Sequence, residues 1–216
     1  LPLAGMIAIL LSEVRGKKFK KTVQTAITIP NFISWIIIYS IMFSLFSNDG
    51  LLTTLVRGLS GNRDSTVTLL TNPGTAKLFM VLTNIWKTVG YNSIIFFAAV
   101  TGIDSQLYDA AAVDGAGRWQ KILHITIPGI LPTFITLLII SVGAILNNGF
   151  EQYYVFVNPM IQKNIEVLDY YVYRIGMLNN DIPASTAVSM IKTFISVVLV
   201  FSVNKLSKKT LGQSIL

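Results

Sequence analysis

The segment YDAAAVDGAGRWQKILHITIPGILPT, residues 108–133, places acids, bases, glycines and two prolines between two long apolar runs. Residues 107–113 are rich in alanine, the residue with the highest helix propensity, and they predict a short helix. Asp114-Gly115 predicts a turn after this helix, because glycine tolerates a positive φ. Consecutive alanines leave one helix face with little side-chain bulk. Another surface could therefore approach the backbone of this helix closely.

The second half of the segment predicts another short helix over residues 117–123. Pro128 and Pro132 are expected to end this helix, since proline biases the preceding residue toward an extended backbone. Helix, turn and helix would form a rigid protrusion beside the membrane. The residue pattern alone leaves open an ordinary cytoplasmic loop with helical content.

The composition of the whole chain indicates an integral membrane protein. Of its 216 residues, 52% are hydrophobic and 12% are charged, about half the charged fraction of a typical soluble domain. The mean hydropathy is +0.63. The chain has no cysteine, which excludes disulfides and thiolate metal sites. We therefore expect an all-α membrane fold.

Five apolar segments divide the chain, which we treat as one transmembrane domain over residues 1–216. We expect about five membrane helices here and six or so in a full subunit. The first segment is too short to span a bilayer, and the chain opens without an initiator Met or signal peptide. An N-terminal part is therefore expected to be missing. The segments are 1–13, 22–47, 75–101, 130–149 and 182–204.

Basic residues are distributed unevenly between the connections of these segments. Ten Lys and Arg residues lie in 14–21, in 102–129 and in the tail after 204, while the loops 48–74 and 150–181 hold four. The positive-inside rule then places the basic connections and the C-terminus in the cytoplasm. The net charge of +7 follows this topology pattern, so it does not indicate nucleic-acid binding. Within the outer loop 150–181, residues 164–176 predict an interfacial helix.

Polar residues inside the apolar segments are candidates for lining a transport path, because they are costly in lipid. Small residues among them also suit helix–helix packing, which remains the alternative for each serine. Ser185, Ser189, Lys192 and Ser196 share one helical stripe. The candidate path residues are Asn84, Trp86, Lys87, Tyr91, Ser141, Asn148, Ser189 and Lys192.

Lys87 and Lys192 are the most costly of these residues, since each lies near the middle of its segment. An unpaired ammonium there costs at least about 2.5–3.5 kcal/mol on insertion scales. No acid lies within these spans, so water, a carbonyl or a partner subunit must satisfy each charge. A hydrated cavity is our preferred interpretation. It also makes an anionic sugar conceivable as the transported solute.

The segment around residue 114 closely resembles the coupling-loop signature of ABC importer permeases, the binding-protein-dependent transport inner-membrane components. That signature runs Glu-Ala-Ala, three residues, Asp-Gly-Ala, about eight residues and Ile-x-Leu-Pro. This chain has DAA at 109–111, DGA at 114–116 and ITIP at 125–128. It departs by Asp109 for Glu, by two intervening residues rather than three, and by Ile127 for Leu.

Two further phrases extend the resemblance over essentially the whole chain. LLSEVRGKKFKKTVQ at 10–24 and IPNFISW at 29–35 look like the subfamily that imports oligosaccharides, including polysaccharide fragments. Related disaccharide permeases have sugar-contacting residues at the positions of Tyr91, Ser141 and Asn148. A further polar position of theirs falls on Ile145, so their sugar pose does not transfer.

The resemblance implies that residues 108–128 form a coupling helix within a coupling loop, 102–132. The alanine face would pack in a cleft of a separate ATP-binding subunit, with Asp109 and Arg118 at the rim. The implied partners are a second homologous permease, two ATPase copies that bind ATP and Mg²⁺, and an extracytoplasmic solute-binding protein. The chain itself would bind no cofactor and would lie in the plasma membrane. The coupling residues are Asp109, Ala110, Ala111, Asp114, Gly115, Ala116, Arg118 and Pro128.

Other functions are less well supported by the sequence. A phosphate loop is absent, because the only Gly-Lys, Gly16-Lys17, has Leu11 where glycine is required. No acid, His or Cys cluster suggests a membrane enzyme, and we expect a structural or docking role for the sole histidine, His124. An ABC permease for a non-sugar solute remains an alternative. A secondary transporter is another, although it would be expected to carry intramembrane acids.

Overall fold

The computed structural model describes residues 1–14, 16–60, 69–147 and 149–211. Over these ranges the regular secondary structure is helical, with no strand, which confirms the all-α class. The chain divides into two compact units, each built from separate stretches of sequence. Each unit is described by itself below.

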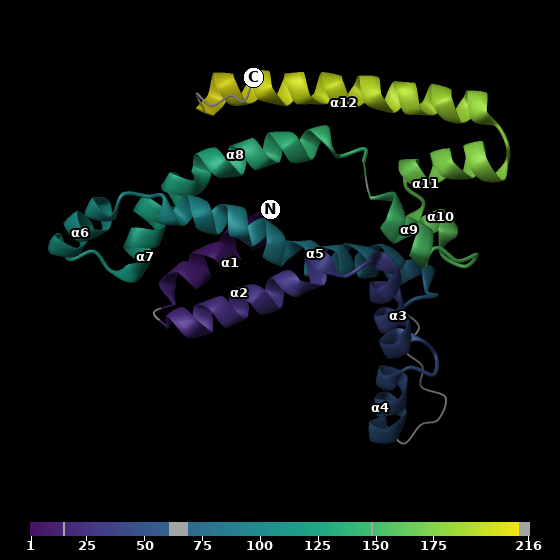
Figure 1. Ribbon diagram of the computed structural model, residues 1–216, viewed down its shortest axis with the longest axis horizontal. Coiled ribbons are helices and arrows are strands. Elements are labelled where there is room, and N and C mark those ends of the chain that lie inside the picture. The colour runs from purple at the N-terminus through teal and green to yellow at the C-terminus, as the bar shows by residue number, and fades with distance from the viewer. Residues whose placement is uncertain (15, 61–68, 148, 212–216) are drawn as a thin grey trace. The chain divides into compact units, whose positions relative to one another are not determined.

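The first unit comprises Leu1–Asn31, Trp86–Ile145 and the chain from Ile195 onward (Figure 1). It contains the second half of helix α5 and the second half of helix α12, together with most of α2. Its elements are α1 (Pro2–Glu13), α2 (Lys17–Phe32), α5 (Pro73–Thr101), α6 (Ser105–Val113), α7 (Arg118–Lys121), the π-helical turn η1 (Ile122–Thr126), α8 (Ile127–Gly143) and α12 (Ile182–Leu211).

The first unit packs around Phe96, which is fully buried in α5. Small residues of α1 and apolar residues of α8 surround this ring, and Gly5 lies against it. Helices α2 and α5 approach even more closely at Gly90, where an added Cβ would overlap the Ile27 carbonyl oxygen. Small residues at a crossing permit this kind of close approach between membrane helices.

The second unit comprises Phe32–Ile85 and Leu146–Phe194. It contains the first halves of α5 and α12 and a series of shorter helices. These are α3 (Trp35–Phe46), α4 (Leu51–Ser60), α9 (Phe150–Phe156), α10 (Gln162–Ile165), α11 (Leu168–Tyr173) and the π-helical turn η2 (Arg174–Leu178).

An aromatic cluster fills the core of the second unit. The ring of Phe156 meets Tyr39 edge to face at 5.1 Å and Trp35 at 6.4 Å. Phe79 of α5 continues the cluster, with its ring 6.2 Å from Phe156 and 5.3 Å from Phe46. Edge-to-face pairs of this kind add about 0.5–1.5 kcal/mol beyond the area that they bury. The cluster therefore fixes α9 against α3 and α5.

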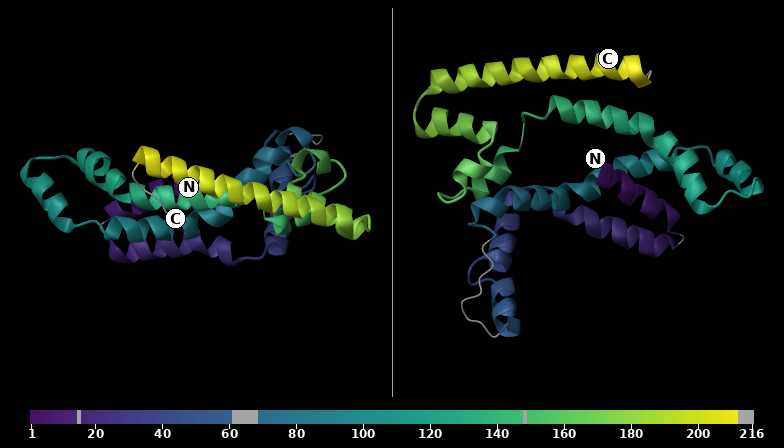
Figure 2. Two further views of the ribbon diagram at one scale, coloured as in Figure 1. Left: turned by 90° about the horizontal axis from the view of Figure 1, so that it is seen from above. Right: turned by 180° about the vertical axis from the view of Figure 1, so that it is seen from behind.

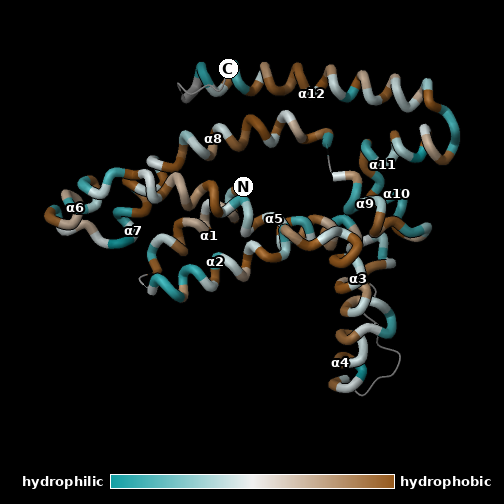
Figure 3. Tube along the Cα trace, in the orientation of Figure 1, coloured by the Kyte–Doolittle hydropathy of each residue, from teal (hydrophilic) through white to brown (hydrophobic). Residues whose placement is uncertain are grey.

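Three described stretches are long and apolar enough to cross a membrane, whereas the sequence predicted about five such helices. They are Trp35–Ser60, Arg118–Gly143 and Ile182–Lys209. Helix α5 has the required length, but polar residues such as Asn84 and Lys87 lower its hydropathy. Helix α1 has only 12 residues. Figure 3 shows hydrophobic residues concentrated in the middle of α12, with hydrophilic ones at its ends.

The predicted apolar segment 22–47 is two helices rather than one. Helix α2 ends at Phe32, and α3 begins at Trp35 after Ser34. Pro30 lacks an N–H group and weakens the last turn of α2. The Ser34 hydroxyl then accepts a hydrogen bond from the Ile37 amide at 3.4 Å, which caps a new helix. A hydrophobicity pattern does not detect this interruption.

The prediction that Pro128 and Pro132 end a helix is wrong. The helical chain continues from α7 through η1 into α8, where Pro128 occupies the first turn and Pro132 lies inside. Each proline removes one amide donor from this continuous helix, and the π turn just before Pro128 accommodates the local mismatch. The interfacial helix predicted over 164–176 also differs, because α11 begins at Leu168 and continues as η2 to Leu178.

Candidate functional site

The module at residues 104–121 has the predicted helix and turn. The Asp104 carboxylate accepts a bond from the Gln106 amide at 2.9 Å and caps the start of α6. At the other end, the Ala116 amide donates to the Ala111 carbonyl at 2.8 Å and the Gly115 amide to Ala112 at 3.2 Å. Gly115 has a φ of +75°. This paired closure is a Schellman motif, and it requires glycine at that position.

Several contacts hold the module on the rest of the first unit. The Tyr108 hydroxyl of α6 lies 2.9 Å from the hydroxyl of Thr126, which is buried in η1. Arg118 of α7 forms an ion pair with Glu13 of α1, with Nε and Oε2 at 3.2 Å. His124 makes a bond through Nδ1 to the Gln120 carbonyl at 3.0 Å, which fits a structural role. The module is thus a braced element.

The surface of the module is unusually apolar for an exposed element. No residue of α6 is buried, although the helix carries a run of three alanines. Large apolar side chains beside them are also exposed, to 89% for Val113 and 74% for Trp119. Figures 1 and 2 show α6 and α7 projecting beyond the ends of α5 and α8 within this unit. Such a surface is typical of a docking site for another protein.

The candidate path residues are distributed over both units. Asn148 lies outside the described residues. Ser141, Trp86 and Tyr91 are exposed in the first unit, and Ser189 of the second unit donates to its own helix at the Ser185 carbonyl. The Ser185 hydroxyl oxygen lies 2.6 Å from the position where Gly176 would carry a Cβ. This contact supports the packing alternative for that serine.

Lys87 is bound by backbone carbonyls of the first unit. Its side chain is only 9% exposed, and Nζ donates to the carbonyls of Asn31 at 3.0 Å and Pro30 at 3.3 Å. These carbonyls lie in the last turn of α2, where helical partners are lacking and positive charge is favourable. Of the partners considered for the Lys87 ammonium, backbone carbonyls are the ones observed, whereas a hydrated cavity was the preferred interpretation.

Lys192 forms an ion pair with Asp169 of α11, in the second unit. The two side chains are 14% and 18% exposed, so the pair is largely removed from solvent. A second ion pair, Arg174–Glu166 at 2.7 Å, joins residues on either side of Asp169 in the same loop. The sequence pattern does not predict the pairing of Lys192 with Asp169, since the acid lies outside the spans. An acid is therefore the partner of Lys192, contrary to the expectation of a hydrated cavity.

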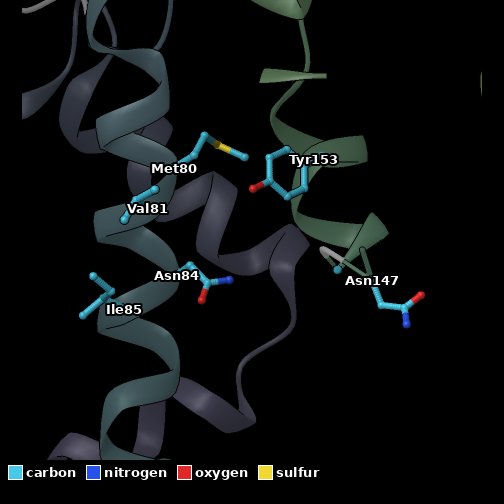
Figure 4. Close-up of a pocket in the computed structure, with 7 residues that line it drawn as sticks. Met80, Val81, Asn84, Ile85, Asn147 and Tyr153 are labelled. Carbon is cyan, nitrogen blue, oxygen red and sulfur yellow. The ribbon is translucent and has the colours of Figure 1, made fainter. Parts of the chain in front are cut away.

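A pocket of about 470 Å³ opens in the second unit between α5 and the chain around α9. Its polar lining comes from Asn84, Asn147 and Tyr153, and Figure 4 shows Asn84 and Tyr153 reaching inward from opposite walls. Burial raises the pKa of the Tyr153 hydroxyl above its ordinary value of 10.0, so it stays a neutral donor. Met80, Val81, Ile85 and Gly149 complete the lining.

Among the described residues that line it, the pocket has amides and a phenol but no charged side chain. Such groups bind hydroxyls by donating and accepting hydrogen bonds, and nearby apolar residues suit a sugar face. Of its lining residues, sequence reasoning selected Asn84 and missed Tyr153. Tyr153 lies in a loop by the sequence pattern, and only the fold brings it opposite Asn84.

Metal binding is not indicated by the described part of the chain. No group of three or more His, Asp or Glu side chains there could hold a metal ion.

Known proteins resemble this chain over nearly its whole length. Protein LplB of Bacillus subtilis is 37% identical over 209 residues, which cover 96% of this chain and 65% of LplB. The polygalacturonan/rhamnogalacturonan transport system permease protein YteP of the same organism is 39% identical, covering 96% of this chain and 64% of YteP. The chain thus spans just under two thirds of the length of these relatives.

A solved structure is similar as well. A chain of a bacterial alginate ABC transporter, in complex with a periplasmic protein that holds alginate pentasaccharide, superposes with a TM-score of 0.93. The identity is 32%, and the match covers 99% of this chain and 74% of that one. The model of one family, the inner membrane component of binding-protein-dependent transport systems, matches residues 2–211. The chain belongs to this family of membrane transport components.

Proposed function

We propose that this chain is the transmembrane permease part of an ATP-driven importer that moves oligosaccharides into the cell. The observation that carries the proposal is the α6–α7 module. Its alanine-rich helix and its large apolar side chains are exposed, while hydrogen bonds and an ion pair brace it on the first unit. A braced, apolar projection can receive force from another protein and transmit it to the membrane helices.

The proposed partner at the module is an ATP-binding subunit, present in two copies that hold ATP and Mg²⁺. Ala110 and Ala111 would pack in a cleft of that subunit, with Asp109 and Arg118 at its rim. The ion pair of Arg118 with Glu13 is largely exposed and therefore weak, so the guanidinium can exchange partners. A second homologous permease and an extracytoplasmic solute-binding protein complete the proposed assembly.

The proposed solute is a fragment of an acidic polysaccharide. The names of YteP and of the alginate transporter support this class for relatives of the chain. Lys87 and Lys192 already have carbonyl and carboxylate partners within the chain, so they are poor candidates for binding sugar carboxylates. The neutral pocket at Asn84 and Tyr153 instead favours contacts with hydroxyl groups.

The test is purification of the full-length protein from native membranes, with identification of the proteins that accompany it. The complex is then reconstituted in liposomes with its binding protein, and ATPase activity is measured with oligomers of galacturonate, of alginate uronates and of neutral glucose. We expect an ATPase subunit to copurify and uronate oligomers to stimulate hydrolysis. Purification without an ATPase would overturn the importer. Stimulation by neutral oligomers alone would overturn the substrate class.

A further inference from the structure

Gln152 of α9 lies behind the pocket and is almost fully buried, with 1% of its surface exposed. Its Nε2 donates to the Met80 carbonyl at 2.8 Å, and its Oε1 accepts from Nδ2 of Asn84 at 2.9 Å. Met80 and Asn84 lie one helical turn apart on α5, and both line the pocket. A single buried amide therefore connects α9 to two lining residues.

This arrangement fixes the orientation of the Asn84 carboxamide. A side-chain amide has a donor end and an acceptor end, and here Gln152 engages the donor end of Asn84. The bond to Met80 holds Gln152 itself in place, since a buried amide without partners would be costly. A binding group that is held in one orientation loses less freedom when a ligand arrives.

We propose that Gln152 is a positioning residue, which holds Asn84 so that its amide hydrogen-bonds a hydroxyl of the transported sugar. The inference rests on the proposed function, because it assumes that the pocket at Asn84 is part of an oligosaccharide path. It extends that function, because it assigns the pocket to hydroxyl groups on an uncharged edge of the transported sugar. Gln152 acts through Asn84 and does not touch the sugar.

The experiment measures discrimination between competing substrates by the reconstituted full-length complex. Galacturonate trimer competes for uptake with each of its monodeoxy analogues, and the binding protein is the same throughout. The uptake ratio does not depend on how many transporters fold, so it separates recognition from stability. The variants are Gln152→Leu, Asn84→Leu and the double variant. Thr83→Val removes a buried hydroxyl that donates along α5 to the Phe79 carbonyl at 2.8 Å, and serves as the matched control.

We expect the wild type to disfavour one deoxy analogue by about tenfold, the value of one well-placed hydrogen bond. Gln152→Leu and Asn84→Leu should each reduce that factor to about twofold or less, and the double variant should lose no more. Thr83→Val should keep the wild-type ratio. Gln152→Asn, a shorter amide that cannot span both partners, should behave as Gln152→Leu and serves if the leucine variant fails to assemble.

The inference is overturned if the Gln152 variants keep the wild-type ratio while uptake falls, which would indicate a purely structural role. A larger loss in the double variant than in Asn84→Leu would also overturn it, because Gln152 would then act independently. Equal uptake of all analogues by the wild type would show that no single hydroxyl contact contributes to recognition, and this too would overturn the inference. A wild type that imports no oligosaccharide at all refutes the proposed function, which is a separate and visible result.

Discussion

Among single residues, the two lysines in the long helices show how this chain carries charge in an apolar setting. Lys87 binds two carbonyls in the last turn of α2, and Lys192 binds the carboxylate of Asp169. Each ammonium connects two helices that are distant in sequence. The charges therefore hold tertiary structure together, and their cost in lipid is offset inside the chain.

Replacement of Lys192 by Met should destabilise the protein by about 2–4 kcal/mol, because Asp169 would remain as a largely buried and unpaired charge. Thermal unfolding of the purified protein in detergent would measure the loss. The double variant Lys192→Met/Asp169→Leu should recover most of it, since neither charge remains. If the double variant were as unstable as the single one, the ion pair would not be the cause.

Replacement of Gly90 by Ala should destabilise the protein by about 2–4 kcal/mol, because the new methyl group would overlap the Ile27 carbonyl and force α2 from α5. Gly58→Ala is the control. No atom of the described residues lies within 4 Å of a Cβ at that position in α4, so alanine should be neutral or slightly stabilising there. The yield of folded protein and its unfolding temperature check both variants. If the two variants were equally stable, the close approach of α2 to α5 at Gly90 would be refuted.

Sequence reasoning selected the costly residues but could not find their partners. Asn84, Lys87 and Lys192 were recognisable because polar groups in apolar helices are rare. Asp169 and Gln152 lie in loop 150–181 by the sequence pattern, and the bonds that they form span 23 and 68 positions of sequence. Such long-range pairing depends on packing, and no local pattern encodes it.

Among the helical elements, the turn that depends on short-range hydrogen bonds was predicted correctly, whereas the continuous helix through Pro128 was not. The turn at Asp114-Gly115 followed from glycine chemistry, and its bonds join residues at most five apart. The continuous helix through Pro128 was missed, because it depends on the π turn η1 just before it. Local rules thus predicted the tip of the module but not its junction with α8.

A bulky charge on α6 should uncouple the chain from its proposed ATPase without unfolding it. Ala110 is exposed, so Ala110→Arg should leave the unfolding temperature unchanged and reduce ATPase copurification and uptake by at least about tenfold. Ala110→Ser keeps a small side chain and should retain both. Pull-down with a tagged permease and uptake in liposomes would measure the effect. An Ala110→Arg complex that assembles and transports normally would contradict docking through the alanine face.

For the molecule as a whole, charge and apolar length together determine the expected orientation in the membrane. The basic connections before residue 22 and after residue 204 contrast with the loop 150–181, which has two basic residues. The positive-inside rule predicts that the first two lie in the cytoplasm and the third outside. The α6–α7 module must also lie in the cytoplasm if it contacts an ATPase.

The absence of cysteine from the sequence permits a direct test of this orientation. Single cysteines introduced at Lys18, Ser105 and Met160 fall on exposed positions of α2, α6 and the loop between α9 and α10. In intact cells, a membrane-impermeant maleimide should label Met160→Cys, while Lys18→Cys and Ser105→Cys should react only after permeabilisation. The parent protein without the introduced cysteine is the background control. Labelling of Ser105→Cys from outside would place the α6–α7 module on the wrong side of the membrane for ATP-driven coupling, and the proposed importer would then fail.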